Sequence, residues 1–501
     1  MASKKLGILF LGSVILAFLA GYFSSQILPS FPVGSGSDVF EDITESFENF
    51  YYYDIDDAEI QDAFIASMEA TINSYAEANN DPYTRLVATP LSATPSGDEM
   101  FIGIGISFVM EDFNLRVAYV YPGGAAEDIL YPNDLIIGIV INNESFYFNT
   151  MDSKTEVMMY LSGSLDDTKT FIVLDPDSNE YTIDLTYIEI PTPTAYMLDL
   201  GETDIAYIKI TQFSGYVEDV SVGTSKVFSD ILNDLEESTL SIDSNTKTLI
   251  IDLRDNPGGA LTALHNADDS KMIPGITQQL LIKNIEVPLF QMIPKSGDIR
   301  NFYGNLSSPK PYDIAVLVND HSASAAEVLA AVLNTYGGYP LYGTLTYGKG
   351  VYQNTLHLKD INDIRYSLVY TEGEWFYNDG KNVAEDPLDV NIIEQEGIKA
   401  LDMPIYGGML EFNQVSGYLG SYQAFLNYYD DLEEGSALRT DGYFDLATKT
   451  ALENFQFEQS LVVSGMLDRE TSIVIHQLYM QRVQDLTYDI QLQNLIDIIK
   501  S

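Results

Sequence analysis

Strands and helices alternate between residues 204 and 395, and this alternation narrows the folds open to the chain more than any other feature. Apolar runs of strand length are followed by segments with helical periodicity, which is the pattern of a parallel sheet with crossover helices. Residues 268–310 show no clear pattern and are interpreted as a lid or an insertion. The sequence therefore predicts an α/β core, with strands over 204–210, 246–254 and 314–320 and helices over 222–236 and 325–337.

The rest of the chain differs from this core, and its 501 residues are enough for about three or four domains. Helical periodicity over 38–80 predicts a pair of helices that ends at Asp81, since the following proline disfavours helix there. Short strands and turns from Phe101 onward predict a compact β-rich module. A multidomain chain with α/β and α+β parts is expected, divided into a membrane anchor or signal segment (1–24), a linker (25–38), a helical segment (39–100), the β-rich module (101–175), the α/β core (176–398), a small helical module (405–480) and a C-terminal helix (481–501).

Two related sequence motifs, one beginning at Gly442 and one at Gly465, mark the small helical module. Gly442 and Gly465 each stand three residues before an aspartate and six residues before a threonine. Asp445 and Asp468 are predicted to be N-caps, because an aspartate at this position accepts a hydrogen bond from a free amide of the first helical turn. The repeated motif thus predicts two helices, each with an aspartate N-cap.

The N-terminus indicates where the chain resides. Lys4 and Lys5 precede the uncharged apolar run 6–23, which at 18 residues is near the minimum length for crossing a bilayer. Positive charge before such a run keeps that end in the cytoplasm, so a single-pass anchor would leave the bulk of the chain outside. A cleaved signal peptide, which would make the protein secreted, is the main alternative, and a buried core helix is a weaker one.

Charge and residue usage exclude several functions. Lys and Arg number 25 and Asp and Glu 74, so the net charge of −49 argues against a nucleic-acid partner and against docking on anionic lipid through a basic patch. Cysteine is absent, which removes disulfides and thiolate metal sites. The four histidines form no HExxH motif, which argues against a zinc metalloprotease. No metal or cofactor is expected.

Two serines lie where the strand 314–320 passes into the helix 325–337. Ser322 and Ser324 precede free amides at the N-terminus of that helix, which would stabilise a developing oxyanion. Helix capping is the competing interpretation, because serine is a preferred N-cap residue. The sequence alone does not decide between the two roles, or between the two serines.

A nucleophilic serine needs a base, and Lys349 is the better candidate. Glycines on both sides let the backbone bend tightly around it, and Tyr347, Val351 and Tyr352 are expected to cover it. Burial would lower the pKa of the lysine and provide a neutral amine. His321 is a weaker candidate, because neighbours in an extended strand point to opposite faces.

The turn Asp255-Asn256-Pro257-Gly258-Gly259 follows the strand 248–254, and its glycines suit close approach of the backbone to a ligand. Together with Ser322–Glu327 and Gly348–Gly350, it resembles the motifs of the carboxyl-terminal processing (tail-specific) serine proteases, peptidase family S41. The resemblance extends over about residues 38–395. It implies a Ser–Lys dyad and identifies, by position, Ser324 as nucleophile, Lys349 as general base, Gln353 as the residue that orients the lysine, and the amides of Gly258 and Ala325 as the oxyanion hole.

Two further resemblances concern binding. The β-rich module resembles a PDZ domain, whose carboxylate-binding loop matches Gly103, Ile104, Gly105 and Ile106, so a substrate tail would add to it as a strand. The usual Gly-Asp pair of that family is Asn133-Asp134 here, a departure that concerns tail affinity. The module 405–480 resembles a three-helix peptidoglycan-binding domain, with a dimerisation or packing module as the alternative.

Taken together, these resemblances imply an extracytoplasmic serine endopeptidase that cleaves near protein C-termini, with a PDZ domain that recognises the tail. Its expected partners are proteins or peptides with free C-termini, the membrane through the N-terminal helix, and peptidoglycan. A non-catalytic, wall-associated scaffold that binds protein tails and peptidoglycan is the alternative. Whether the chain forms a homo-oligomer is left open.

Overall fold

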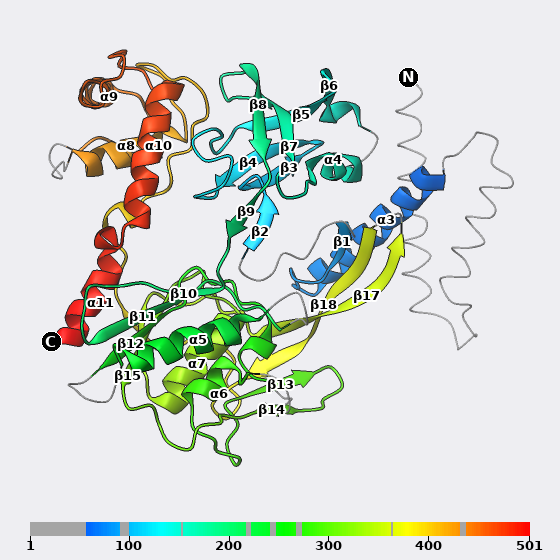
Figure 1. Ribbon diagram of the computed structural model, residues 1–501, viewed down its shortest axis with the longest axis vertical. Helices are drawn as coiled ribbons and strands as arrows, with labels where there is room; N and C mark the ends of the chain where they lie inside the picture. The colour runs from blue at the N-terminus through cyan, green and yellow to red at the C-terminus, as the bar shows by residue number, and fades with distance from the viewer. Residues whose placement is uncertain are drawn as a thin grey trace. The chain divides into compact units, whose positions relative to one another are not determined.

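A computed structural model describes residues 57–90, 100–151, 154–216, 222–240, 247–266, 273–361, 364–430 and 437–501 (Figure 1). Two compact units, Met1–Leu86 and Val87–Ser501, are described separately. The expected anchor, the linker and the first helix of the predicted pair lie outside the described residues. Among the helices that are described, none combines the length and the apolar character needed to cross a membrane.

The first unit contains helix α3 (Asp57–Ala78) and the start of β1 (Arg85–Pro90). The predicted stop of this helix at Asp81 is confirmed. The Asp81 carboxylate accepts hydrogen bonds from the Tyr83 amide at 3.0 Å and from the Thr84 hydroxyl at 2.5 Å, so it caps the turn that leads out of the helix.

A six-stranded sheet forms the centre of the second unit, in the order β10-β11-β12-β15-β16-β19. All neighbours in it are parallel except the antiparallel edge strand β10. The sequence predicted this alternation because parallel strands are covered on both faces and read as continuous apolar runs. The elements are β10 (Ala195–Met197), β11 (Ile205–Ile210), α5 (Thr224–Glu237), β12 (Thr248–Asp252), β15 (Asp313–Val318), α7 (Ala325–Gly337), β16 (Leu341–Gly343) and β19 (Val390–Ile392).

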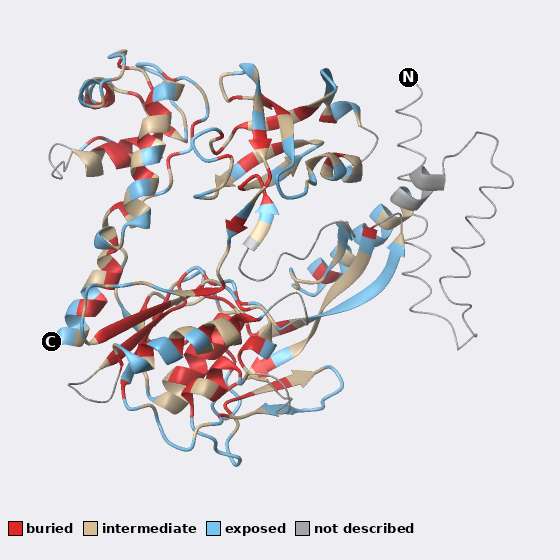
Figure 2. Cartoon of the chain, viewed as in Figure 1, coloured by how far each residue is buried: buried red, intermediate tan, exposed pale blue. Residues whose placement is uncertain are grey.

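Both faces of this sheet are buried. One face packs with α5 and α7 in the main hydrophobic core, and these helices and the strands they cover are largely buried (Figure 2). Phe228 of α5 and Leu329 of α7 are fully buried. The other face packs with the last helix of the chain, α11 (Ile490–Lys500), through Leu492 and Leu495. The helix predicted over 481–501 is shorter than expected, since residues 481–484 end α10, and α11 packs on the protease core rather than on the module before it.

A second sheet joins the long strands β17 (Val351–Ile361) and β18 (Ile364–Phe376) to a short hairpin. The hairpin consists of β13 (Phe290–Pro294) and β14 (Arg300–Phe302), and β13 pairs with the end of β18. The stretch without clear periodicity thus contains this hairpin together with η2 (Leu261–Ala263) and α6 (Ile276–Leu280).

The β-rich module is an antiparallel sheet in the order β3-β4-β5-β7-β8, with β6 paired to β5. Its predicted end at residue 175 is too early, since β8 pairs with β7 along its whole length after the turn at Asp175. The strand β2 enters the module and pairs with β9, which leaves it, so the β module spans residues 100–191. Its elements are β2 (Met100–Gly103), β3 (Ile106–Glu111), β4 (Asn114–Val120), β5 (Leu135–Ile141), β6 (Glu144–Tyr147), η1 (Phe148–Thr150), α4 (Lys154–Leu161), β7 (Thr168–Leu174), β8 (Glu180–Thr186) and β9 (Ile188–Pro191).

The helical module has the repeat that the sequence predicts. Asp445 accepts a hydrogen bond from the Thr448 amide and Asp468 from the Thr471 amide, so both predicted N-caps are confirmed. The module has its own core, which includes the fully buried Phe425. Its elements, and those that flank it, are η3 (Gly397–Ala400), α8 (Leu419–Tyr429), α9 (Leu446–Glu458), α10 (Arg469–Gln484) and η4 (Leu486–Tyr488).

Candidate active site

Ser324 is the N-cap of α7, at the junction between β15 and the helix. Its φ of 55° lies in the left-handed region, which a residue with a side chain adopts only when its surroundings hold it there. The Ala326 amide donates to the Ala323 carbonyl at 3.1 Å, and the Val328 amide donates to the Ser324 carbonyl at 2.9 Å, so the first helical turn starts at the Ser324 backbone. A residue with a strained backbone at the start of a helix is typical of a site with a chemical role.

Ser322, the other candidate nucleophile, has a structural role. It is fully buried, and its hydroxyl donates a hydrogen bond to the Leu253 carbonyl at 2.8 Å. The same hydroxyl accepts from the Asn319 amide at 2.9 Å, and so links the end of β12 to the turn after β15. Because both interactions occupy the Ser322 hydroxyl, Ser324 is the remaining candidate.

Glu327 joins the serine to the loop that carries the lysine. Its fully buried carboxylate accepts hydrogen bonds from the amides of Ser324 and Lys349, each at 2.8 Å, and from the Gly348 amide at 2.6 Å. One charged group thus binds the backbone of both residues of the predicted dyad. Glu327 belongs to the Ser322–Glu327 motif, but the sequence predicted no role for its side chain.

The loop around Lys349 is held by residues that sequence reasoning missed. The indole N–H of Trp375 donates to the Lys349 carbonyl at 2.8 Å, and the side-chain amide of Asn382 donates to the Gly350 carbonyl at 3.0 Å. Trp375 is almost completely buried and is the only tryptophan of the chain, which is a signal that could have pointed to it.

Lys349 itself is half-buried. Of the residues predicted to cover it, Tyr352 is buried, whereas Tyr347 is 57% exposed. Gly350 is required at its position, because a Cβ there would lie 1.8 Å from Oδ1 of Asn382. This close approach explains why the lysine is followed by glycine.

Gln353 lies in β17, opposite Thr371 of β18 and beside an irregularity in the pairing of the two strands. Its side-chain amide donates a hydrogen bond to the Thr371 hydroxyl at 3.3 Å. Its predicted role in orienting Lys349 remains a prediction.

The loop after β12 approaches Ser324 closely. A Cβ on Gly258 would lie 2.8 Å from the Cβ of Ser324 and 3.0 Å from the Ala325 nitrogen, so only glycine fits there. Asn256 is fully buried, and its side chain donates to the Ile210 carbonyl and accepts from the Gly258 amide at 2.8 Å. The oxyanion hole therefore remains a prediction, because in this conformation Asn256 occupies one of its two donors.

His321 lies on the surface, with 73% of its side chain exposed. Its Nδ1 atom is 3.1 Å from a carboxylate oxygen of Asp320 and 3.7 Å from one of Asp255. A solvated imidazole between carboxylates has no structural feature that directs it to Ser324, which favours Lys349 as the base.

In the β module, the predicted carboxylate-binding residues form the connection from β2 to β3. Gly105 has a φ of +84°, and a Cβ on it would lie 2.6 Å from the Cα of Gly124. Strand β3, which begins at Ile106, is the edge strand of its sheet within the described residues. An open edge beside a glycine loop is the geometry needed for strand addition.

The β module contacts the helical module through buried polar groups. Arg469 of α10 lies 2.9 Å from the fully buried carboxylate of Asp134. Asn133 has a φ of 78°, which asparagine tolerates, and its side-chain amide donates to the Tyr406 carbonyl at 2.8 Å. The replacement of the family's glycine by Asn133 thus preserves the backbone conformation and adds a contact to the helical module.

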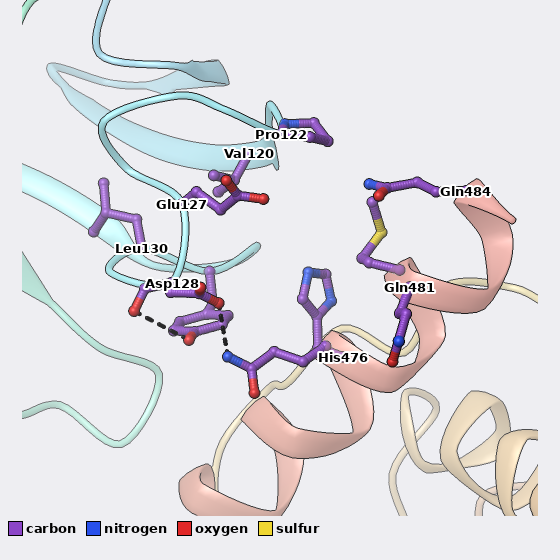
Figure 3. Close-up of a pocket in the computed structure, with 11 residues that line it drawn as sticks. Val120, Pro122, Glu127, Asp128, Leu130, His476, Gln481 and Gln484 are labelled. Carbon is purple, nitrogen blue, oxygen red and sulfur yellow. Dashed lines mark hydrogen bonds between the residues drawn. The ribbon is translucent and has the colours of Figure 1, made fainter.

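A cavity of about 320 Å³ lies along this contact (Figure 3). The β module contributes Glu127, Asp128 and Tyr131 to its lining, and α10 contributes His476 and Gln481. Burial lowers the pKa of His476, whereas its hydrogen bond to the Pro404 carbonyl and the nearby Asp128 oppose this effect. Neutral and acidic groups therefore line the cavity.

Comparisons with known proteins address the core and the helical module. Residues 204–393 match the model of peptidase family S41, and residues 420–474 match that of a peptidoglycan binding domain. The α/β core over residues 204–393 is therefore a peptidase S41 domain. The resemblance seen in the sequence is thereby confirmed, and the protein is a serine-type peptidase of the carboxyl-terminal processing group with a peptidoglycan-binding-like domain.

Relatives of this S41 peptidase align over most of its length. It is 25% identical over 479 residues to the carboxy-terminal processing protease CtpB of Bacillus subtilis, covering 92% of this chain and 88% of that protein. It is 26% identical over 452 residues to a probable CtpA-like serine protease of Staphylococcus aureus, with 86% and 80% covered. The solved structure of a photosystem II D1 C-terminal processing protease is 18% identical, covers 71% of this chain and 86% of its own, and superposes with a TM-score of 0.38.

Proposed function

We propose that this peptidase cleaves near the C-termini of proteins outside the cytoplasm, with Ser324 as nucleophile and Lys349 as general base. The observation that carries the proposal is the binding of both residues by Glu327. Its carboxylate accepts from the Ser324 and Lys349 amides at the same distance of 2.8 Å. A reaction that passes a proton between two side chains needs their relative position to be held in this way.

The proposed reaction has two halves. Neutral Lys349 takes the hydroxyl proton of Ser324 while the serine oxygen attacks the scissile carbonyl. The amides of Gly258 and Ala325 bind the oxyanion, for which Gly258 must exchange its bond to Asn256 for one to the substrate. The protonated lysine then gives its proton to the departing amine, which leaves an acyl-enzyme. Water attacks the ester, Lys349 accepts the proton of the water, and the released serine recovers a proton from the lysine.

The β module is proposed to be a PDZ domain that binds the substrate tail. The open edge of β3 supplies backbone hydrogen bonds, and the loop Gly103–Ile106 supplies amides for the terminal carboxylate. Gly105→Val should raise KM for a substrate with a free C-terminus and leave KM for its C-terminally amidated form unchanged. Gly123→Val is the matched control, since Gly123 also has a positive φ but has open space around its Cβ position. Equal KM changes in both variants would contradict tail recognition by this loop.

The location is proposed from the N-terminal sequence alone. Lys4 and Lys5 before the apolar run 6–23 favour a single-pass anchor with the remainder outside. Protease added to intact protoplasts should digest the chain beyond residue 25, and full protection of that part would contradict the assignment.

Wall contact is proposed from the helical module. The full chain should co-sediment with purified peptidoglycan, and binding should persist in added salt, because a chain with a net charge of −49 is not attracted by wall polyanions. Failure to sediment at every salt concentration would favour a packing role for the module.

The dyad is tested by cleavage of an unfolded protein substrate. Ser324→Ala and Lys349→Arg should each abolish turnover, since arginine stays protonated at any usable pH. His321→Ala is the matched control, because this exposed residue lies close in sequence and should leave the rate unchanged. Turnover by Lys349→Arg, or its loss in His321→Ala, would contradict the mechanism. An inactive wild-type chain that still binds tails and peptidoglycan would instead indicate the scaffold function.

A further inference from the structure

The last helix of the chain returns to the protease sheet after the helical module. Its apolar residues Leu492, Leu495 and Ile496 pack against Ile250 and Leu317 of the central strands. The helix therefore covers the face of the sheet opposite to α5 and α7 (Figure 1). The peptidoglycan-binding-like module is inserted between β19 and α11, so α11 belongs to the core although it follows the module in sequence.

The start of this helix binds a buried arginine of the core. Arg254 donates hydrogen bonds to both carboxylate oxygens of Asp489, at 3.0 and 2.9 Å, and to the side-chain oxygen of Gln491 at 2.9 Å. Arg254, Asp489 and Gln491 are each at most 8% exposed. These are bidentate, charge-assisted bonds in a site removed from water, which is the geometry in which such bonds are strongest.

The rest of the cluster belongs to the core and its end. Arg254 also donates to Asp252, at 2.6 Å for the shortest bond. Lys209 donates to Asp252 and to the Arg254 carbonyl, and Lys399 donates to Asp489 at 3.0 Å. Burial opposes the ionisation of Asp489, but the hydrogen bonds and charges of Arg254 and Lys399 outweigh it and hold the pKa of this carboxyl below its ordinary value.

Arg254 stands directly before the loop 255–259 that approaches the nucleophile. The backbone of this loop is bound to the serine segment, since the Ala323 amide donates to the Asn256 carbonyl at 2.9 Å. The Gly258 backbone is in contact with Ser324, as the lack of room for a Cβ there shows. A change in the position of Arg254 would therefore be transmitted to the loop within a few residues.

We propose that Asp489 and Gln491 are positioning residues for the peptidase reaction, which they influence by fixing Arg254 and the loop 255–259 against Ser324. This inference rests on the proposed role of Ser324. The two residues touch neither the substrate nor the reacting atoms. Their removal should lower kcat and leave KM unchanged, because the loop serves the transition state rather than tail binding.

The experiment compares variants that destabilise α11 with and without disturbing Arg254. Asp489→Asn loses one charged partner of Arg254 and should lower kcat by about tenfold or more, since misplacement of a catalytic group by ~1 Å can cost ~10²-fold. Gln491→Met, which removes a single bond to Arg254 and one to the Ile393 carbonyl, provides a milder second variant should Asp489→Asn fail to fold. Leu495→Ala is the matched control, because it weakens the packing of the same helix without touching Arg254.

The readouts separate positioning from stability. The affinity for a peptide boronate, which mimics the tetrahedral intermediate, should fall in parallel with kcat in Asp489→Asn and Gln491→Met. Both quantities should stay near wild type in Leu495→Ala, even where its melting temperature falls as far.

Two results would overturn the inference. One is unchanged kcat in the folded variants, and the other is an equal loss in Leu495→Ala at equal stability. Wild type and Ser324→Ala are measured in the same assay. If wild type and Ser324→Ala have the same kcat, Ser324 is not the nucleophile. If their kcat values differ while Asp489→Asn and Gln491→Met keep the wild-type kcat, only the positioning role is contradicted.

Discussion

Replacing Glu327 by glutamine should slow the peptidase reaction without removing any group of the dyad. The glutamine side chain has the same shape, but it has one acceptor oxygen and no charge. If this oxygen keeps the bonds to Ser324 and Lys349, the new N–H₂ group faces the Gly348 amide, which now donates to the carboxylate at 2.6 Å. One hydrogen bond is then replaced by a contact between two donors.

The magnitude follows from the burial of the site. A hydrogen bond to a charged group is worth ~1.5–3 kcal/mol, and a buried donor left unpaired costs ~1–3 kcal/mol. Glu327 is fully buried, so water cannot replace the lost acceptor. Glu327→Gln should therefore lower the free energy of unfolding by about 4 kcal/mol, a sum of these two contributions at the middle of their ranges. Relaxation of the Gly348–Lys349 backbone should lower kcat at least about tenfold, with KM unchanged.

The assay is steady-state cleavage of a peptide together with chemical denaturation of each variant. Asp445→Asn is the matched control, since Asp445 also accepts from a helical amide and a threonine hydroxyl, but lies in the helical module. It should cost stability and leave kcat unchanged. Wild-type kcat in Glu327→Gln, or an equal loss of kcat in Asp445→Asn, would refute the view that this carboxylate holds the dyad together.

Three further outcomes are expected. Ser322→Ala should lower the unfolding free energy by about 1–3 kcal/mol, because the Asn319 amide loses its acceptor, yet retain measurable turnover; a denaturation curve and a cleavage assay check this, and complete inactivity of the folded variant would contradict the structural role of Ser322. Gln456→Ala should destabilise the helical module by about 1–3 kcal/mol, since the Gly465 and Ser464 amides lose the same acceptor, while the cleavage rate stays unchanged; loss of activity at full stability would contradict this. The pKa of His476 is lowered from its ordinary value of 6.5 by burial, so its neutral form is favoured in the folded state, and its contribution to stability, complete above pH 6.5, is lost as the pH falls through its lowered pKa. The melting temperature should fall less between pH 7.5 and 5.5 in His476→Gln than in wild type, and equal falls would contradict a contribution of His476, which lines its cavity beside Glu127, Asp128 and Tyr131.

The order of elements in the core could be predicted because burial leaves a direct trace in sequence. All five residues of β12 are buried, and they appear as an apolar run that ends in the functional loop. The N-caps Asp445 and Asp468 were equally readable, because a cap bonds only to a residue three positions away. Predictions of this kind depend on neighbours in sequence and need no knowledge of the fold.

The end of the β module was misplaced for a related reason. The polar segment from Asp175 to Asn179 reads as a boundary, yet it is a hairpin turn in which the Asp175 amide donates to the Asn179 carbonyl. Ser178 adopts a φ of 65° there, a left-handed conformation that a serine in the sequence does not predict. A domain boundary and a tight turn have the same composition, so only the pairing of β7 with β8 distinguishes them.

The contacts that hold the site were not predictable, because they join residues far apart in sequence. Trp375 bonds to Lys349 across 26 positions, and Asp489 bonds to Arg254 across 235. In the helical module, Gln423 and Gln456 bind the two repeated motifs in the same way, each accepting from the glycine amide and donating to the threonine hydroxyl. They precede their glycines by 19 and 9 residues, and this unequal spacing concealed the shared role of the two glutamines.

Two buried ion pairs attach the ends of the helical module, and they differ in strength. Burial raises the pKa of Asp134 above its ordinary value, and the hydrogen bond and charge of Arg469 do not fully offset this. For Asp489 the balance is reversed, since Arg254 and Lys399 lower its pKa despite burial. The charged form of Asp134 thus costs free energy where α10 meets the β module, whereas that of Asp489 stabilises the contact of α11 with the core. Separation of the β module from α10 would rehydrate a carboxylate that burial disfavours, whereas detachment of α11 would break a pair that burial leaves favourable. The balance between burial and pairing thus runs in opposite directions at these two carboxylates.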